Sequence, residues 1–132
     1  MKLKGSVKIM VLTAGLLILG WEAPRVVTAQ LVQPLVVSVT NYPNPFDSRS
    51  ERTTILFSLA QDSQVHVAIY DLLGNLVRQF PSKQESAGTA SIVWDGTNDD
   101  REKVAKGGYL VLVVANSETG TAHAIRKVGV LH

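Results

Sequence analysis

Three histidines are the first residues in this sequence whose side chains could do chemistry. His66, His123 and the C-terminal His132 show none of the close spacings at which histidines share a metal ion on a helix or hairpin. No hydroxyl residue stands in a recognisable nucleophile elbow. The absence of cysteine excludes a thiolate metal site, a cysteine nucleophile and a lipid anchor on an N-terminal cysteine. We therefore expect no catalytic residue and no cofactor.

The loop 94–103, WDGTNDDREK, is the best metal candidate. Its possible ligands share the hard oxygen donors that calcium accepts: Asp95, Asn98, Asp99 and Asp100. The spacing does not fit the helix-loop-helix calcium motif, because Lys106 stands where that motif has its last glutamate. Nearby cationic side chains also oppose a divalent ion. We expect a solvated turn whose Asp and Asn side chains accept backbone hydrogen bonds, with calcium as the weaker alternative.

Trp94 and Tyr109 flank this loop and could form a platform for a ligand such as a sugar. A single tryptophan at the end of a strand more often belongs to the core, with its indole N–H bonded nearby. We therefore favour the core for Trp94, with a carbohydrate site as the alternative.

Residues 1–29 have the layout of a secretory signal peptide. A basic start precedes the apolar run 9–21, which at about thirteen residues is too short for a bilayer span. Small residues then lead to an expected cleavage after Ala29. This segment holds four of the 13 basic and one of the 11 acidic residues, so the remainder has a formal charge of −1. With this formal charge, the remainder of the chain has no excess of basic residues of the kind that binds nucleic acid.

The elements that must position these residues are short strands. Apolar and polar residues alternate, and β-branched and aromatic residues are frequent, with glycine-containing turns between the runs. The expected strands are 34–40, 52–60, 64–71, 75–80, 88–95, 108–116 and 122–131. No helical stripe interrupts them after residue 29. We predict an all-β fold, an immunoglobulin-like antiparallel β-sandwich of about seven strands.

The stretch 41–46, NYPNPF, interrupts this pattern with two prolines. Prolines lack amide donors and fix φ, so the stretch cannot be helix or central strand. We expect a stiff, extended, polyproline-like corner after the first strand, with Tyr42 and Phe46 buried at its two ends.

In chain order, several stretches resemble one bacterial family: YPNPF (42–46), TTILFSL (53–59), VHVAIYDLLGNLVR (65–78), AGTASIVWDG (87–96), VAKGGYLVLV (104–113) and RKVGVL (126–131). They are similar to the Ig-like domain of FlgD-type flagellar hook-capping proteins and to type A C-terminal sorting domains of the type IX secretion system. The matching positions are expected to be structural: Tyr42, Pro43, Asn44, Pro45, Phe46, Tyr70, Asp71, Gly74, Trp94, Asp95, Gly96, Gly108, Tyr109 and Lys127. We expect a signal peptide (1–29), an N-terminal segment or first strand (30–39) and the Ig-like domain (40–132). Arg101 departs from the family, which commonly has glycine there.

The resemblance implies a non-enzymatic, exported module, extracellular, on the cell surface or periplasmic, that acts in protein–protein contact, surface attachment or assembly. Edge strands are its expected means of binding a protein partner or itself, with 30–40 as a candidate donor or edge strand. A type IX sorting signal and a calcium- or carbohydrate-binding module are the alternatives. The sandwich begins almost at the expected cleavage site, without cargo, so a free-standing subunit, a partner module and a remnant of a longer protein stay open. No transmembrane span is expected after cleavage.

Overall fold

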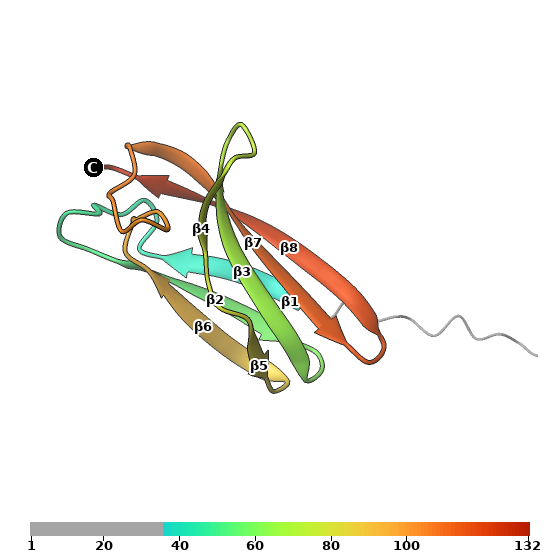
Figure 1. Ribbon diagram of the computed structural model, residues 1–132. Helices are drawn as coiled ribbons and strands as arrows, with labels where there is room; N and C mark the ends of the chain where they lie inside the picture. Colours follow the sequence, from blue (N-terminus) through green and yellow to red (C-terminus); the bar gives the residue numbers. More distant parts are fainter. Residues whose placement is uncertain (1–35) are drawn as a thin grey trace, which may run out of the picture. The chain divides into compact units, whose positions relative to one another are not determined.

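The computed structural model describes residues 36–132, which form eight β-strands and no helix (Figure 1). The strands are β1 (Val36–Tyr42), β2 (Thr53–Leu59), β3 (Ser63–Asp71), β4 (Leu76–Gln79), β5 (Lys83–Glu85), β6 (Gly88–Trp94), β7 (Gly107–Ser117) and β8 (Gly120–Val130). Every ladder between them is antiparallel. The predicted all-β, antiparallel class is confirmed.

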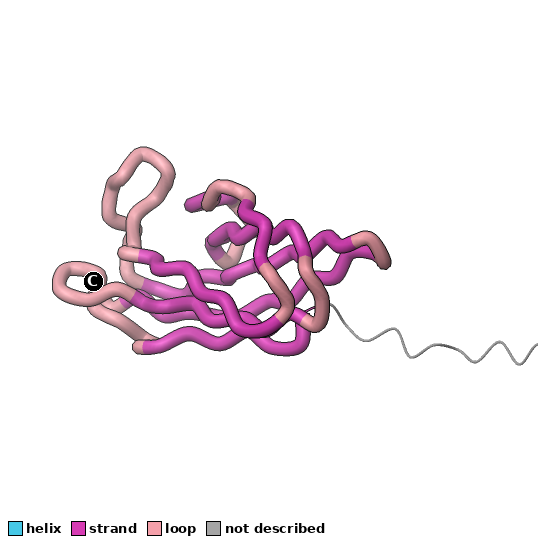
Figure 2. The backbone as a smooth tube through the Cα atoms, turned by 90° about the horizontal axis from the view of Figure 1, so that it is seen from below, coloured by secondary structure: helices cyan, strands magenta, loops and turns pink. Residues whose placement is uncertain are grey.

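The strands form two sheets. One has three strands in the order β1-β2-β6; the other has five, in the order β4-β3-β7-β8 with β5 also pairing with β3. Figure 2 shows the strands running along the body and the loops gathered at its ends. In this arrangement β6 and β8 are edge strands of different sheets.

The core lies between the sheets and follows the predicted alternation. The inward side chains of β2, β3 and β7 are buried: Ile55, Phe57, Leu59, Val65, Val67, Ile69, Val111, Val113 and Ala115. The strand 108–116 was expected to be covered on both faces. The structure buries one face of β7 and leaves the other half-exposed, at Leu110, Leu112 and Val114.

The strand β5 is the one that sequence patterning missed. It has three residues, all polar, so it carries no alternation of apolar and polar positions. Its pairing with β3, which puts Val65 opposite Lys83, comes from the neighbouring strand rather than from its own sequence.

The proline stretch moves the chain from one sheet to the other. β1 pairs with β2 as far as Tyr42, whereas Phe46 forms a parallel bridge with Val130 of β8. The predicted corner is present, but it is bent rather than extended, and the peptide bonds before both prolines are cis. Phe46 is fully buried as expected; Tyr42 was expected to be buried and is 77% exposed, so that prediction is wrong.

The expected signal peptide and residues 30–35 lie outside the described residues. Residues 36–40, the rest of the candidate donor segment, belong to β1 at the edge of the three-stranded sheet. Within residues 36–132 no helix is long and apolar enough to cross a membrane.

Candidate functional site

Three aromatic side chains from distant parts of the chain meet at one end of the sandwich. Phe46 follows the proline corner, Trp94 ends β6, and Tyr109 lies near the start of β7. Their rings pack edge to face, with centroids 5.6 Å apart for Phe46–Trp94 and for Trp94–Tyr109. All three are buried. Trp94 therefore packs in the core, as favoured from the sequence, and offers no exposed platform. We call this the aromatic end.

The loop after Trp94 folds back on it through hydrogen bonds. The indole N–H of Trp94 donates to the Thr97 carbonyl at 2.9 Å, and the Asp95 carboxylate accepts from the Thr97 amide (3.1 Å) and hydroxyl (2.6 Å). Gly96, between them, has φ +78°, and a Cβ there would lie 2.5 Å from Cβ of Ser48. Only glycine fits this position.

Arg78 of β4 occupies the centre of this loop. Its guanidinium donates to the Thr97 hydroxyl and to the Asn98 carbonyl (3.3 Å), and it lies 3.7 Å from a carboxylate oxygen of Asp95 and 3.9 Å from one of Asp99. Sequence reasoning did not single out Arg78. Arg78 is the last residue of the stretch 65–78 (VHVAIYDLLGNLVR), one of those that resemble the family, and this position could have marked it as a structural residue.

Three of the four calcium candidates, Asp95, Asn98 and Asp99, form side-chain hydrogen bonds within the chain. The Asn98 side chain accepts from the amides of Asp100 and Glu102, both at 2.9 Å. The Asp99 carboxylate accepts from the Gln79 amide at 3.0 Å. Burial raises the pKa of Asp95, but the hydrogen bonds from Thr97 and the nearby Arg78 charge outweigh it, so the net pKa is lowered. In residues 36–132 no three His, Asp or Glu side chains group as metal ligands would. Asp and Asn side chains that accept hydrogen bonds from backbone amides are what the sequence led us to expect of a solvated turn.

Asp99 also covers an edge of the five-stranded sheet. Its amide donates to the Val77 carbonyl at 3.0 Å, while its carboxylate accepts from Gln79, so one residue satisfies two backbone groups of β4. Such covering protects an edge against unwanted pairing. The acidic loop thus acts as a β-edge cap.

The proline corner caps the opposite edge of the same sheet. The Asn44 side chain donates to the Lys127 carbonyl at 3.1 Å and accepts from the Gly129 amide at 2.9 Å. Pro45 packs on Gly129, where a Cβ would come within 3.0 Å of the proline ring, and the Pro43 carbonyl accepts from the Thr53 hydroxyl at 2.8 Å. The corner is therefore held by both sheets.

The hairpin between β3 and β4 accounts for Asp71 and Gly74. The Asp71 carboxylate accepts from the Asn75 side chain and amide and from the Leu73 amide, all at 2.9 Å, and these bonds lower its pKa. Gly74 takes φ +93° at the tip. Gly108 lies under Leu72, whose Cδ1 is 3.3 Å from where a Cβ would stand. Two more family positions lie nearby on the exposed face: Tyr70 is half-buried and Lys127 is exposed.

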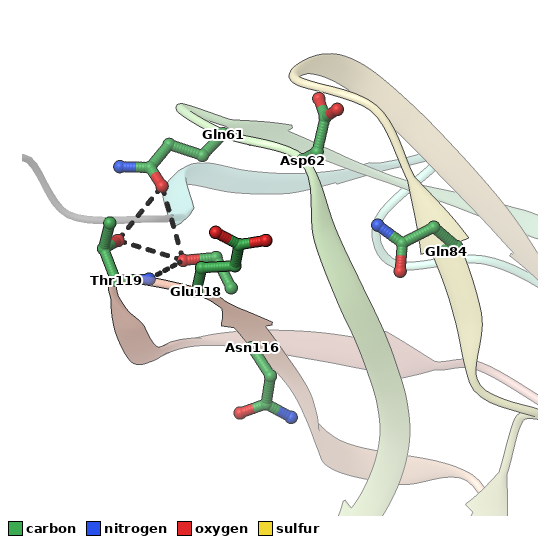
Figure 3. Close-up of a pocket in the computed structure, with 7 residues that line it drawn as sticks. Gln61, Asp62, Gln84, Asn116, Glu118 and Thr119 are labelled. Carbon is green, nitrogen blue, oxygen red and sulfur yellow. Dashed lines mark hydrogen bonds between the residues drawn. The ribbon is translucent and has the colours of Figure 1, made fainter.

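The histidines remain apart. The His66 ring contacts the Ser82 hydroxyl at 2.8 Å, His123 is exposed on β8, and His132 lies 3.7 Å from the Asp47 carboxylate. A polar hollow at the end opposite the aromatic cluster is lined by Gln61, Asp62, Gln84 and the β7–β8 turn (Figure 3). Ser82 and His66 could pair as nucleophile and base, but within residues 36–132 no carboxylate bonds to the His66 ring to orient it.

The strand order, the antiparallel ladders and these internal bonds define an antiparallel Ig-like β-sandwich. The family model of the FlgD Ig-like domain matches residues 44–119, and the chain belongs to this family. No curated protein matches the chain.

Solved structures agree with this assignment. PorU from Porphyromonas gingivalis, in its dimeric latent form, is 29% identical with a TM-score of 0.58 over 70% of this chain. FlgD from P. aeruginosa is 21% identical (TM-score 0.57, 71% of this chain), and FlgD from Xanthomonas campestris, tied to hook capping in flagellar assembly, is 22% identical (TM-score 0.51, 72%). The chain spans 9% of PorU, 70% of the first FlgD and 64% of the second.

Proposed function

We propose that this chain is an exported Ig-like module that works through protein–protein contact, in surface attachment or assembly. One observation carries the proposal. Asn44 and Asp99 cap edges of the five-stranded sheet at the aromatic end, while the two edges of the three-stranded sheet, β1 and β6, have no backbone partner on their outer side among residues 36–132. An unpaired edge can add a strand from another protein.

The strand β6 is the more regular of these two edges, since the ladder of β1 has a register shift between Val36 and Ser38. Its seven residues contain no charge and no proline, and its ladder with β2 has no bulge. Ala90 and Ile92 are only partly buried on the inner face, and Val93 is 47% exposed on the outer face. A strand added beside β6 would cover this apolar surface, so β6 is a suitable docking edge.

Capture from cell-envelope extract tests this proposal. The wild-type chain, purified after export, serves as bait beside Ser91→Lys, which places a charge in the middle of β6. Gln64→Lys is the matched control, because Gln64 is also exposed but lies on β3, which is paired on both sides. We expect one defined partner that S91K loses and Q64K keeps. A wild-type chain that is monomeric and captures nothing would remove the proposal.

A type IX sorting signal is the second candidate, favoured by the 29% identity to PorU over 70% of this chain. The test is a reporter fused ahead of the chain in a host that has this system, with the same reporter alone as control. Release of the fusion outside the outer membrane is the expected result. Retention in the periplasm would contradict this candidate while leaving the contact function intact.

A further inference from the structure

Among the described residues, the outer face of the three-stranded sheet carries no charged side chain. Strands β1, β2 and β6 lie side by side in this sheet (Figure 1), and the residues that alternate with the buried Ile55 and Phe57 point outward. Most of these outward residues are serine or threonine: Ser38, Thr40, Thr54, Ser58, Thr89 and Ser91. The remaining outward residues are Tyr42, Leu56 and Val93. We call this surface the hydroxyl face.

The serine and threonine side chains of the hydroxyl face form no hydrogen bond within residues 36–132. Several hydroxyl groups elsewhere in the described chain do, such as that of Thr53, which donates to the Pro43 carbonyl at 2.8 Å. Thr97 likewise donates to the Asp95 carboxylate at 2.6 Å. Because a hydroxyl group can both donate and accept, the hydroxyl face presents unused donors and acceptors together.

The strands hold these groups in a regular array. The ladder between β2 and β6 has no bulge, and the ladder between β1 and β2 is regular from Ser38 to Tyr42. Side chains opposite one another in such a ladder have Cβ atoms about 5 Å apart, so one sugar ring can reach hydroxyl groups on two strands. Threonine is stiff about its first side-chain torsion, which limits the ordering cost of binding.

Tyr42 stands at one corner of the hydroxyl face, in the same row as Thr54 and Val93. Its side chain is 77% exposed, and its hydroxyl group forms no hydrogen bond in the part of the chain that the structure describes. An exposed tyrosine combines an apolar ring with a polar tip. The ring can stack on the C–H groups of a sugar while the hydroxyl group bonds to a neighbouring one.

We propose that the hydroxyl face binds a neutral polysaccharide, which is a second ligand beyond the protein contact proposed above. Tyr42 stacks on one sugar ring, and the serine and threonine hydroxyl groups bond to the adjoining sugars. Charge decides the class of polymer. The face has no cation to pair with a carboxylate or sulfate group, so an anionic polymer would lose hydration there without gaining a counter-charge.

The composition of the hydroxyl face favours a polysaccharide over a protein. Serine is depleted at protein–protein interfaces, and both serine and threonine are under-represented among the residues that dominate their binding energy. Arginine, which is enriched there, is absent from this face, and Tyr42 is its one aromatic residue. A protein strand beside β6 would bond to the backbone edge of the sheet instead.

Affinity electrophoresis with purified polysaccharides measures this binding. The neutral probes are hydroxyethylcellulose, laminarin, galactomannan and dextran, and alginate is the anionic probe. The chain, purified after export, is run in native gels with and without each polymer, and its two mobilities are compared. We expect at least one neutral polymer to slow the chain and alginate to leave its mobility unchanged. No retardation by any neutral probe, or equal retardation by alginate, would overturn the inference.

Two variants locate the site. Tyr42→Ala should weaken binding about tenfold, with little change in melting temperature because the side chain is exposed. Thr40→Glu should abolish retardation, because it places a carboxylate next to Leu56 in the middle of the face. Leu73→Ala and Thr121→Glu are the matched controls, since they make similar changes at exposed positions outside this sheet. Retardation that Y42A and T40E leave unchanged would show that the polymer binds elsewhere and refute the inference.

The capture experiment judges the proposed function separately. Ser91 belongs to the hydroxyl face and to β6, whereas Tyr42 lies on β1 at the opposite edge of the sheet. Y42A should therefore lose the polysaccharide and keep the protein partner. If no neutral probe binds and Y42A with T40E instead loses a protein partner or a dimer of this chain, the face docks protein and the inference is wrong. A chain that binds polysaccharide and captures no protein would remove the proposed function and leave the inference standing.

Discussion

The side chain of Asn44 pairs with Gly129 as a neighbouring strand would. Its Oδ1 accepts from the Gly129 amide at 2.9 Å while its Nδ2 donates to the Lys127 carbonyl at 3.1 Å. The backbone of Phe46 continues this pairing with bonds of 3.0 and 2.9 Å. One amide side chain thus joins the corner between the sheets to the edge of β8.

Replacing Asn44 should loosen this corner. Asn44→Ala leaves the Gly129 amide and the Lys127 carbonyl without their partner, and we expect the free energy of unfolding to fall by about 1–3 kcal/mol. Urea denaturation measures the change. Gln84→Ala is the control, since Gln84 is exposed and makes no side-chain hydrogen bond within residues 36–132; it should cost less than about 0.5 kcal/mol. Equal effects of the two variants would contradict the capping role.

Two glycines with positive φ should respond differently to alanine. Gly74, at φ +93°, has open space where a Cβ would stand, so Gly74→Ala should cost about 1–2 kcal/mol through backbone strain alone. Gly96, at φ +78°, faces Ser48 at 2.5 Å, so Gly96→Ala should cost about 2–5 kcal/mol. The comparison is made by thermal and urea unfolding. A smaller loss at Gly96 than at Gly74 would show that the loop moves away from Ser48 without cost.

The fold was predictable because period-two patterning reports which face of a strand is buried. Ile55 and Phe57 illustrate this, since both alternate with more exposed neighbours and both are buried. β5 could not be found in this way, because its three polar residues pair through the backbone. Tyr42 was misassigned for a related reason: an aromatic side chain next to proline indicates packing but not the direction in which the corner turns.

The sequence predicted which residues belong to the acidic loop, but it did not predict which groups they bond to. The sequence marked Asp95 and Asp99 as members of a turn, and both accept backbone amide bonds. Their partners come from 2 and 20 positions away along the chain, and the longer contact with Gln79 depends on how β4 lies against the loop. Arg78 was missed for the same reason, since its role exists only once the strand and the loop are brought together.

Arg78 should make the acidic loop indifferent to calcium. Its guanidinium lies within 3.9 Å of both Asp95 and Asp99, so a divalent ion there would meet a resident positive charge. We expect millimolar calcium to leave the melting temperature unchanged. Arg78→Gln should lower the free energy of unfolding by about 1–3 kcal/mol, because the Thr97 hydroxyl and the Asn98 carbonyl lose the donor that the guanidinium supplies. A calcium-dependent rise in melting temperature of the wild-type chain would contradict this reading.

Acid should destabilise the fold through its turn carboxylates. The pKa of Asp47 is lowered to about 2, chiefly by the Arg49 side chain, and the pKa values of Asp71 and Asp95 are also lowered. Each carboxylate binds its proton more weakly in the folded chain than in the unfolded chain, where the value is about 3.9. Their contribution to stability is therefore present above about pH 4 and is lost as the pH falls toward 2.

Melting curves between pH 2 and 7 should show this decline, and Asp71→Asn should make it shallower while lowering the melting temperature at neutral pH. The neutral amide still fills the turn, but it no longer accepts the Asn75 and Leu73 donors as a charged group. Asp100→Asn is the control, because the Asp100 carboxylate makes no hydrogen bond within the described residues, and it should leave the profile unchanged. A profile that is flat down to pH 2, or one that D71N and D100N change equally, would mean that these turn bonds do not set the acid sensitivity.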